Sequence, residues 1–205
     1  MSESRRLWVC IVLMLAGLVV SGWHPYERST WWMEVFPVIV VMVLMGATVR
    51  RYPLSDLLLT LIVVHAAILL IGGAWTYARV PFGFTVAEWF GWQRNPYDKL
   101  GHFAQGFVPA IAAREILLRG QHVRGPRMLG FVVLCIVLAI SATYELIEWG
   151  AAVALGAGAD DFLGTQGDPF DTQSDMLMAL IGGAAALLLL RRAHDKALAR
   201  LSIYE

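Results

Sequence analysis

Residues 54–74 read LSDLLLTLIVVHAAILLIGGA, an apolar run that contains one charged side chain, Asp56. A helix needs roughly 17–25 predominantly apolar residues to cross the hydrocarbon core of a bilayer. This run is long enough to cross by itself, and it predicts a transmembrane helix.

Further apolar runs precede and follow this one. Of the 205 residues, 58% are hydrophobic and 16% are charged, whereas soluble domains carry about 25% charged residues. We therefore predict an all-α fold: a polytopic membrane helix bundle of about six transmembrane helices in a single integral membrane domain, 1–205. Apolar scaffold helices occupy 1–74 and a motif-bearing core occupies 94–190. The expected spans are 7–23, 34–49, 54–74, 100–118, 128–152 and 173–190.

The basic residues predict how the bundle is oriented. Cytoplasmic loops of membrane proteins carry the excess of Lys and Arg. With the N-terminus inside, only four of the 16 basic residues fall on the outer side, so we expect an N-in, C-in topology. The four are Arg28, Arg79, Arg94 and Lys99. The outer loop 75–97 is rich in aromatic residues, and we expect Trp75, Tyr77, Trp89 and Trp92 to form an interfacial belt.

Several other classes of protein are excluded or disfavoured. Arg5 and Arg6 precede an apolar run as in a signal peptide, but residues 19–23 lack a small-x-small cleavage site, so we expect a retained helix. The formal net charge is zero, which gives no basic field for nucleic acid. Cys10 and Cys135 lie in apolar runs and do not support a disulfide framework. Walker, zincin and nucleophile-elbow motifs do not occur.

The ionisable residues of the core gather at its predicted outer end. Ionisable side chains at membrane depth are expensive and therefore suggest a functional site. Asp98 and His102 are spaced i,i+4 and share one helix face. They could be metal ligands or an Asp-oriented base, or Asp98 could cap the helix while His102 makes an interhelical hydrogen bond.

Two carboxylates also lie one turn apart near the end of the span 128–152. Glu145 and Glu148 need a cation, a proton or hydrogen-bond donors if they are buried. The alternative is that both face water at the helix end.

A third group of carboxylates surrounds the start of the last span. Asp160 and Asp161 precede it, Asp171 or Thr172 can cap it, and Asp175 lies in its first turns. Together the clusters predict metal ligation by Glu145, Glu148, Asp171, Asp175 and His102, with catalytic roles for His102 and Asp98. Oxygen ligands suit Mg²⁺ or Ca²⁺, and a histidine adds Mn²⁺ or Zn²⁺.

Three motifs carry a resemblance to a known family. They are residues 95–109 (NPYDKLGHFAQGFVP), 144–149 (YELIEW) and 162–176 (FLGTQGDPFDTQSDM). In these motifs the chain resembles the YjdF family of bacterial inner-membrane proteins, which implies location and fold but no substrate. A looser likeness is to VanZ-like membrane proteins, although Asp175 is followed at +4 by Ala179 where that pattern has Asn.

The function expected from these observations is a polar, metal-binding site at the periplasmic end of the fourth to sixth spans. Its chemistry would be hydrolysis or transfer on a lipid-linked or envelope substrate, aided by a divalent cation. The alternative is an ion- or proton-coupled transporter or a structural membrane protein. The expected partners are the lipid bilayer and such a substrate, the expected location is the bacterial inner membrane, and the sequence sets no oligomeric state.

Overall fold

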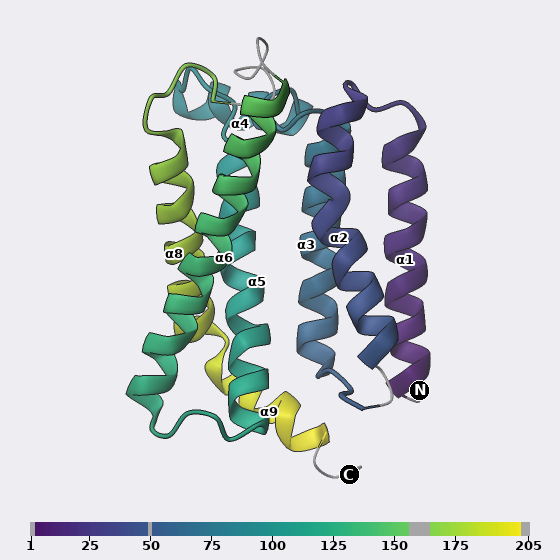
Figure 1. Cartoon of the computed structure of the whole chain (residues 1–205), viewed down its shortest axis with the longest axis vertical. Helices are drawn as coiled ribbons and strands as arrows, with labels where there is room; N and C mark the ends of the chain where they lie inside the picture. Colours follow the sequence, from purple (N-terminus) through teal and green to yellow (C-terminus); the bar gives the residue numbers. More distant parts are fainter. Residues whose placement is uncertain (1–2, 49–50, 156–164, 202–205) are drawn as a thin grey trace. The chain divides into compact units, whose positions relative to one another are not determined.

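The computed structural model describes residues 3–48, 51–155 and 165–201, and all regular elements in these ranges are helices (Figure 1). The predicted all-α fold is confirmed. The chain divides into two compact units, Met1–Tyr97 with Ala193–Glu205, and Asp98–Arg192. That all 205 residues form one membrane domain stays a prediction.

The first unit is built on three long helices, α1 (Glu3–Trp23), α2 (Arg28–Thr48) and α3 (Asp56–Ala74). Their core is built from apolar side chains such as Met14, Val35 and Leu70. The Ser55 hydroxyl accepts a hydrogen bond from the backbone N–H of Leu58 at 3.3 Å and so caps α3. The first unit also contains the short helix α4 (Pro81–Phe90) and, from Ala193 onward, the short helix α9 (Arg191–Leu201).

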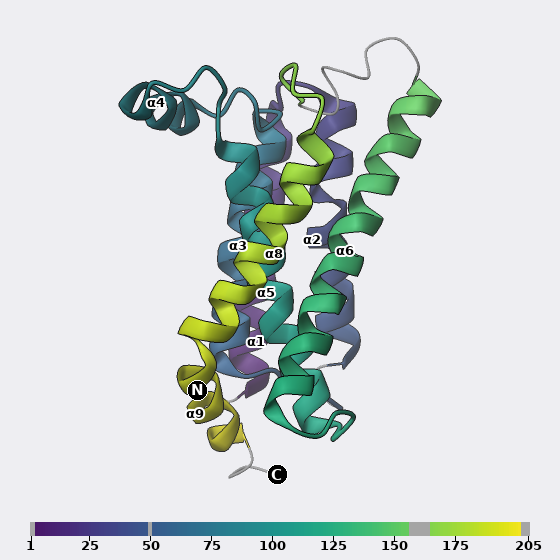
Figure 2. The same ribbon diagram turned by 90° about the vertical axis from the view of Figure 1, so that its left-hand side faces the viewer.

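The second unit contains α5 (Tyr97–Arg119, its first residue belonging to the first unit), α6 (Pro126–Leu155) and α8 (Asp171–Leu189). The two views show that α6 runs antiparallel to α5 and α8 (Figures 1 and 2). The beginnings of α5 and α8 therefore lie at the same end as the last turns of α6. These are the segments that carry the predicted site residues.

Glycines let α5 and α8 approach each other closely. A Cβ added at Gly106 of α5 would overlap with the carbonyl group of Ala179, and one added at Gly182 of α8 would overlap with the carbonyl oxygen of Phe103. Small residues allow such backbone contact between membrane helices. This contact sets the depth at which the polar starts of the two helices face each other.

All six predicted spans are helices. Five helices are long and apolar enough to cross a membrane: α1, α2, α3, α6 and α8. Helix α5 is a continuous helix of 23 residues, but charged side chains such as Asp98, Lys99 and Arg114 interrupt its apolar sequence.

The 75–97 segment differs from its predicted form as a loop. Residues 81–90 form α4 because Pro81 suits the first helical position and Gly91 ends the helix with φ of 66°. Trp75, Trp89 and Trp92 are exposed as expected of a belt. Placing Tyr77 in that belt was wrong, because its side chain is buried and packs against the ring of Tyr97.

Candidate functional site

The first turns of α5 carry three ionisable residues of the site, Asp98, Lys99 and His102. The backbone N–H of Tyr97 donates to Asn95 Oδ1 at 3.0 Å, which starts the helix. The i,i+4 spacing then places Asp98 and His102 on one face, with His102 Nε2 3.4 Å from Asp98 Oδ1. The predicted pair is therefore formed in the structure.

The start of α8 supplies two buried carboxylates, Asp171 and Asp175. Phe170 occupies the cap position, so the expectation that Asp171 or Thr172 would cap this helix was wrong. The Phe170 N–H instead donates to Asp168 Oδ1 at 2.9 Å in the preceding turn. Asp171 consequently lies inside the first helical turn, where the partial positive charge of the helix N-terminus favours a carboxylate.

Lys99 joins α5 to α8. Its ammonium group donates to Asp171 Oδ1 at 2.8 Å and to Asp175 Oδ1 at 2.6 Å. Asp98 Oδ2 lies 3.6 Å from the same nitrogen. Lys99 thus partly neutralises three carboxylates, a role that the sequence analysis did not assign to it. One signal was available, because Lys99 is a basic residue on the predicted outer side and follows Asp98 directly.

His102 lies at the centre of the cluster and is 7% exposed. Its Nδ1 is 3.1 Å from the side-chain oxygen of Gln105 and 3.7 Å from Glu145 Oε1. Its Nε2 faces Asp98 Oδ1 and also lies 3.8 Å from Asp175 Oδ1. Both ring nitrogens therefore lie near oxygen atoms. A neutral ring protonated on Nε2 would direct its Nδ1 lone pair at the Gln105 oxygen, and one protonated on Nδ1 would direct its Nε2 lone pair at Asp98.

Helix α6 contributes Glu145 and Glu148. Glu145 is 7% exposed, and its Oε1 has no hydrogen-bond partner among the described residues. The alternative that Glu145 faces water is therefore excluded. Glu148 is half-buried, and its charge acts on His102.

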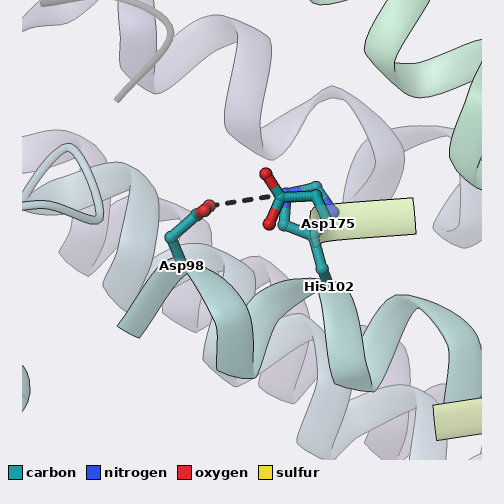
Figure 3. Close-up of side chains that lie close together, drawn as sticks. All are labelled: Asp98, His102 and Asp175. Atoms are coloured by element: carbon teal, nitrogen blue, oxygen red, sulfur yellow. Dashed lines mark ion pairs between the residues drawn. The ribbon is translucent and has the colours of Figure 1, made fainter. Parts of the chain in front are cut away.

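Three residues meet the geometric requirement for a metal site. Asp98, His102 and Asp175 each offer a ligand atom, and these atoms lie within 4.8 Å of one another (Figure 3). Ligands about 2.0–2.2 Å from a tetrahedral metal ion are about 3.3–3.6 Å apart. The 3.4 Å and 3.8 Å separations of His102 from the two carboxylates are close to this spacing.

The cluster also has an excess of negative charge. Five carboxyl groups come from Asp98, Glu145, Glu148, Asp171 and Asp175. Lys99 pairs with three of them, Asp98, Asp171 and Asp175. A bound cation would compensate for this excess of negative charge. Lys99 donates to Oδ1 of both Asp171 and Asp175, so a metal ion would have to use the other oxygen of either carboxylate or displace the lysine. Asp160 and Asp161 lie outside the described residues.

Comparison with known proteins defines the family. A family model described as a predicted membrane protein, DUF2238, matches residues 6–196. The chain belongs to this family. It is 59% identical over 186 residues to the inner membrane protein YjdF of Escherichia coli (strain K12), a match that covers 91% of this chain and 89% of that protein. No solved structure matches.

These matches confirm the resemblance to the YjdF family and the predicted location. The chain is a multi-pass protein of the bacterial inner membrane. The family description names a membrane protein without an activity. A functional assignment must therefore come from the geometry of the site.

Proposed function

We propose that the adjoining ends of α5, α6 and α8 form a divalent-cation site. The observation that carries this proposal is the environment of the His102 ring, which has an oxygen acceptor near each nitrogen. If the Nδ1 proton is donated to Gln105, the Nε2 lone pair is directed at Asp98 and Asp175. A metal ion bound by these three residues would remove that repulsion, and Gln105 would orient the ring.

In this proposal the ligands are His102, Asp98 and Asp175, and Glu145 supplies a further oxygen by a small side-chain movement. Its Oε1 is buried and has no hydrogen-bond partner among the described residues, and His102 Nδ1 lies 3.7 Å from it. Lys99 donates to Oδ1 of both Asp171 and Asp175, so Asp175 would ligate the ion through its other oxygen.

The chemistry that follows is hydrolysis or transfer on a lipid-linked or envelope substrate. A divalent ion can generate hydroxide from bound water at neutral pH and can clamp a phosphate oxygen. Carboxylates held at the ends of membrane helices suit a substrate whose reactive group lies at the level of the lipid headgroups. In this scheme Glu148 on α6 would act as the base, because His102 and Asp98 ligate the ion.

Metal analysis and thermal unfolding of the purified protein test the cation site. Mg²⁺, Ca²⁺, Mn²⁺ or Zn²⁺ at a hundredfold excess over its dissociation constant should stabilise the folded protein by about 2.7 kcal/mol. Asp98→Asn should abolish this gain, whereas Glu88→Gln, an exposed carboxylate on α4, should retain it. Glu148→Gln should be neutral or stabilising without metal and should lose part of the gain with metal.

The same environment supports a second candidate, a proton-coupled or structural role. Protonation of both nitrogens of His102 would also satisfy Gln105 and Asp98. In that case no divalent ion shifts the unfolding temperature of the wild-type protein. The carboxylate variants then lose about 1–3 kcal/mol for a broken buried hydrogen bond, with or without metal. Absence of a shift with all four ions would reject the cation site.

A further inference from the structure

A cavity of about 570 Å³ lies between α1 and α3 in the first unit. This volume is in the range of small-molecule sites, about 300–1,000 Å³. Small residues are part of its lining, among them Gly17 on α1 and Ala66 and Ala67 on α3. The groove is open to the surroundings, since Val20 is 77% exposed and Ile71 is 48% exposed.

The groove has one aromatic end. Trp23, His24, Tyr26 and Trp75 line it where α1 and α3 both finish. The backbone N–H of Tyr26 donates to the carbonyl of Ala74 at 2.9 Å and ties the two turns together. Trp and Tyr concentrate at the headgroup level of membranes. The groove therefore runs from the headgroup level into the depth of the hydrocarbon.

Two exposed arginines lie at this aromatic end. The guanidinium carbon of Arg79 is 4.3 Å from the centre of the Tyr26 ring. Arg28 donates to the carbonyl of Gly22 at 2.6 Å, which holds its side chain beside the turn. The neighbouring carboxylate of Glu27 accepts hydrogen bonds from Ser29 and Thr30 and is directed to the start of α2. The end of the groove therefore presents positive charge.

We infer that this groove binds an anionic glycerophospholipid, with one acyl chain between α1 and α3 and the phosphate group at Arg79 and His24. The apolar lining fits the chain, and the cationic aromatic end fits the headgroup. Arginine forms forked hydrogen bonds to phosphate and is weakly hydrated, so it suits this position. An uncharged lipid would leave the arginines without a counter-charge.

This inference does not rest on the proposed cation site. The groove is built from residues of the first unit, whereas the cation site is built from residues of the second. Lipid binding should therefore persist in Asp98→Asn, and a failure of either proposal leaves the other standing.

Native mass spectrometry of the purified full-length protein in detergent tests the inference. The probes are phosphatidylglycerol, zwitterionic phosphatidylcholine and uncharged diacylglycerol. One molecule of phosphatidylglycerol should bind with at least fivefold preference over the other two, since a basic residue near a headgroup of net negative charge contributes about a fivefold change in affinity and the other two headgroups carry no net charge. Equal binding of the three lipids, or none, would overturn the inference.

Two variants with matched controls locate the lipid. Ala67→Phe fills the groove and should abolish binding, whereas Val64→Phe, exposed on the same helix but outside the groove, should not. Arg79→Gln should weaken phosphatidylglycerol about fivefold with no effect on diacylglycerol, whereas Arg124→Gln, an exposed residue of the second unit, should have no effect.

The unfolding temperature of each variant is measured alongside. Unchanged binding in Ala67→Phe with an unchanged unfolding temperature would overturn the inference. If Ala67→Phe does not fold, Arg79→Gln decides, and full phosphatidylglycerol affinity in that variant has the same meaning. Light scattering that shows a dimer dissociated by Ala67→Phe, without lipid bound to the wild type, would assign the groove to a second copy instead.

Discussion

Lys99 Nζ lies 2.6 Å from Asp175 Oδ1, and this ion pair joins the first turns of α5 to those of α8. The same ammonium holds Asp171 at 2.8 Å. The two carboxylates are 4% and 8% exposed, whereas the lysine is 24% exposed. Buried carboxylates without a counter-charge are costly. The pairing therefore explains how this end of the second unit tolerates its acidic residues.

Lys99→Met should destabilise the protein by about 3 kcal/mol. Removing one partner of a buried ion pair leaves an uncompensated charge and costs about 3–5 kcal/mol, and the partial exposure of Lys99 favours the low end. Thermal unfolding measures the loss. A divalent cation should restore part of it. Lys196→Met, exposed on α9, is the control, and equal unfolding temperatures for the two variants would contradict the role of the pair.

Gly106→Ala should separate α5 from α8. The added methyl group would overlap with the Ala179 carbonyl, and overpacking of this kind costs about 1–3 kcal/mol. The separation should also weaken the Lys99–Asp175 pair, so any metal-dependent stabilisation should decrease. Gly130→Ala on α6 meets no atom within 4 Å and should stabilise by about 0.5–1 kcal/mol through helix propensity. A neutral Gly106→Ala would show that the helices are not in backbone contact.

Ser141→Ala should be neutral or stabilising. The Ser141 side chain is fully buried on α6, one turn before Glu145, and its hydroxyl has no hydrogen-bond partner among the described residues. Removing an unsatisfied polar group relieves a desolvation cost of about 1–3 kcal/mol. Thr143→Ala is the control, because its hydroxyl donates to the carbonyl of Ala139. A loss of more than about 1 kcal/mol in Ser141→Ala would reveal a polar partner for this hydroxyl.

Glu27 should make stability depend on pH. Hydrogen bonds from Ser29 and Thr30 lower the pKa of Glu27. A lowered folded-state pKa contributes stability above the unfolded pKa of about 4.3, and this contribution is lost as the pH falls through the folded value. Glu27→Ala should cost about 0.5–2 kcal/mol at pH 7 as a lost cap. Unfolding curves from pH 7 to 3 should show the difference from wild type shrinking, and a constant difference would contradict the carboxylate role.

Topology can be tested by cysteine labelling in cells. The basic residues predict that positions near 50, 122 and 195 face the cytoplasm and that positions near 90 and 163 face the periplasm. Periplasmic reagents should label only the second group. Labelling of position 163 from the cytoplasm would place the proposed cation site on the other side of the membrane.

The helices could be predicted from sequence because each is determined by local properties. A run such as 54–74 must satisfy its own backbone hydrogen bonds in a bilayer, so it becomes a helix whatever its neighbours are. The pairing of Asp98 with His102 is equally local, because an i,i+4 spacing fixes it. The start of α4 at Pro81 and its end at Gly91 also follow local rules. Residues 75–97 were nevertheless expected to form a loop.

Only the tertiary structure decided which partners meet across helices. Lys99 and Asp175 are 76 residues apart, and their contact depends on the glycine-mediated approach of α5 to α8. The burial of Tyr77 against Tyr97 is also decided by tertiary packing. From sequence alone, a tyrosine in a segment rich in tryptophan fits an interfacial belt equally well. Sequence periodicity fixes which face a side chain occupies, but the rotation and depth of two packed helices depend on side chains from both.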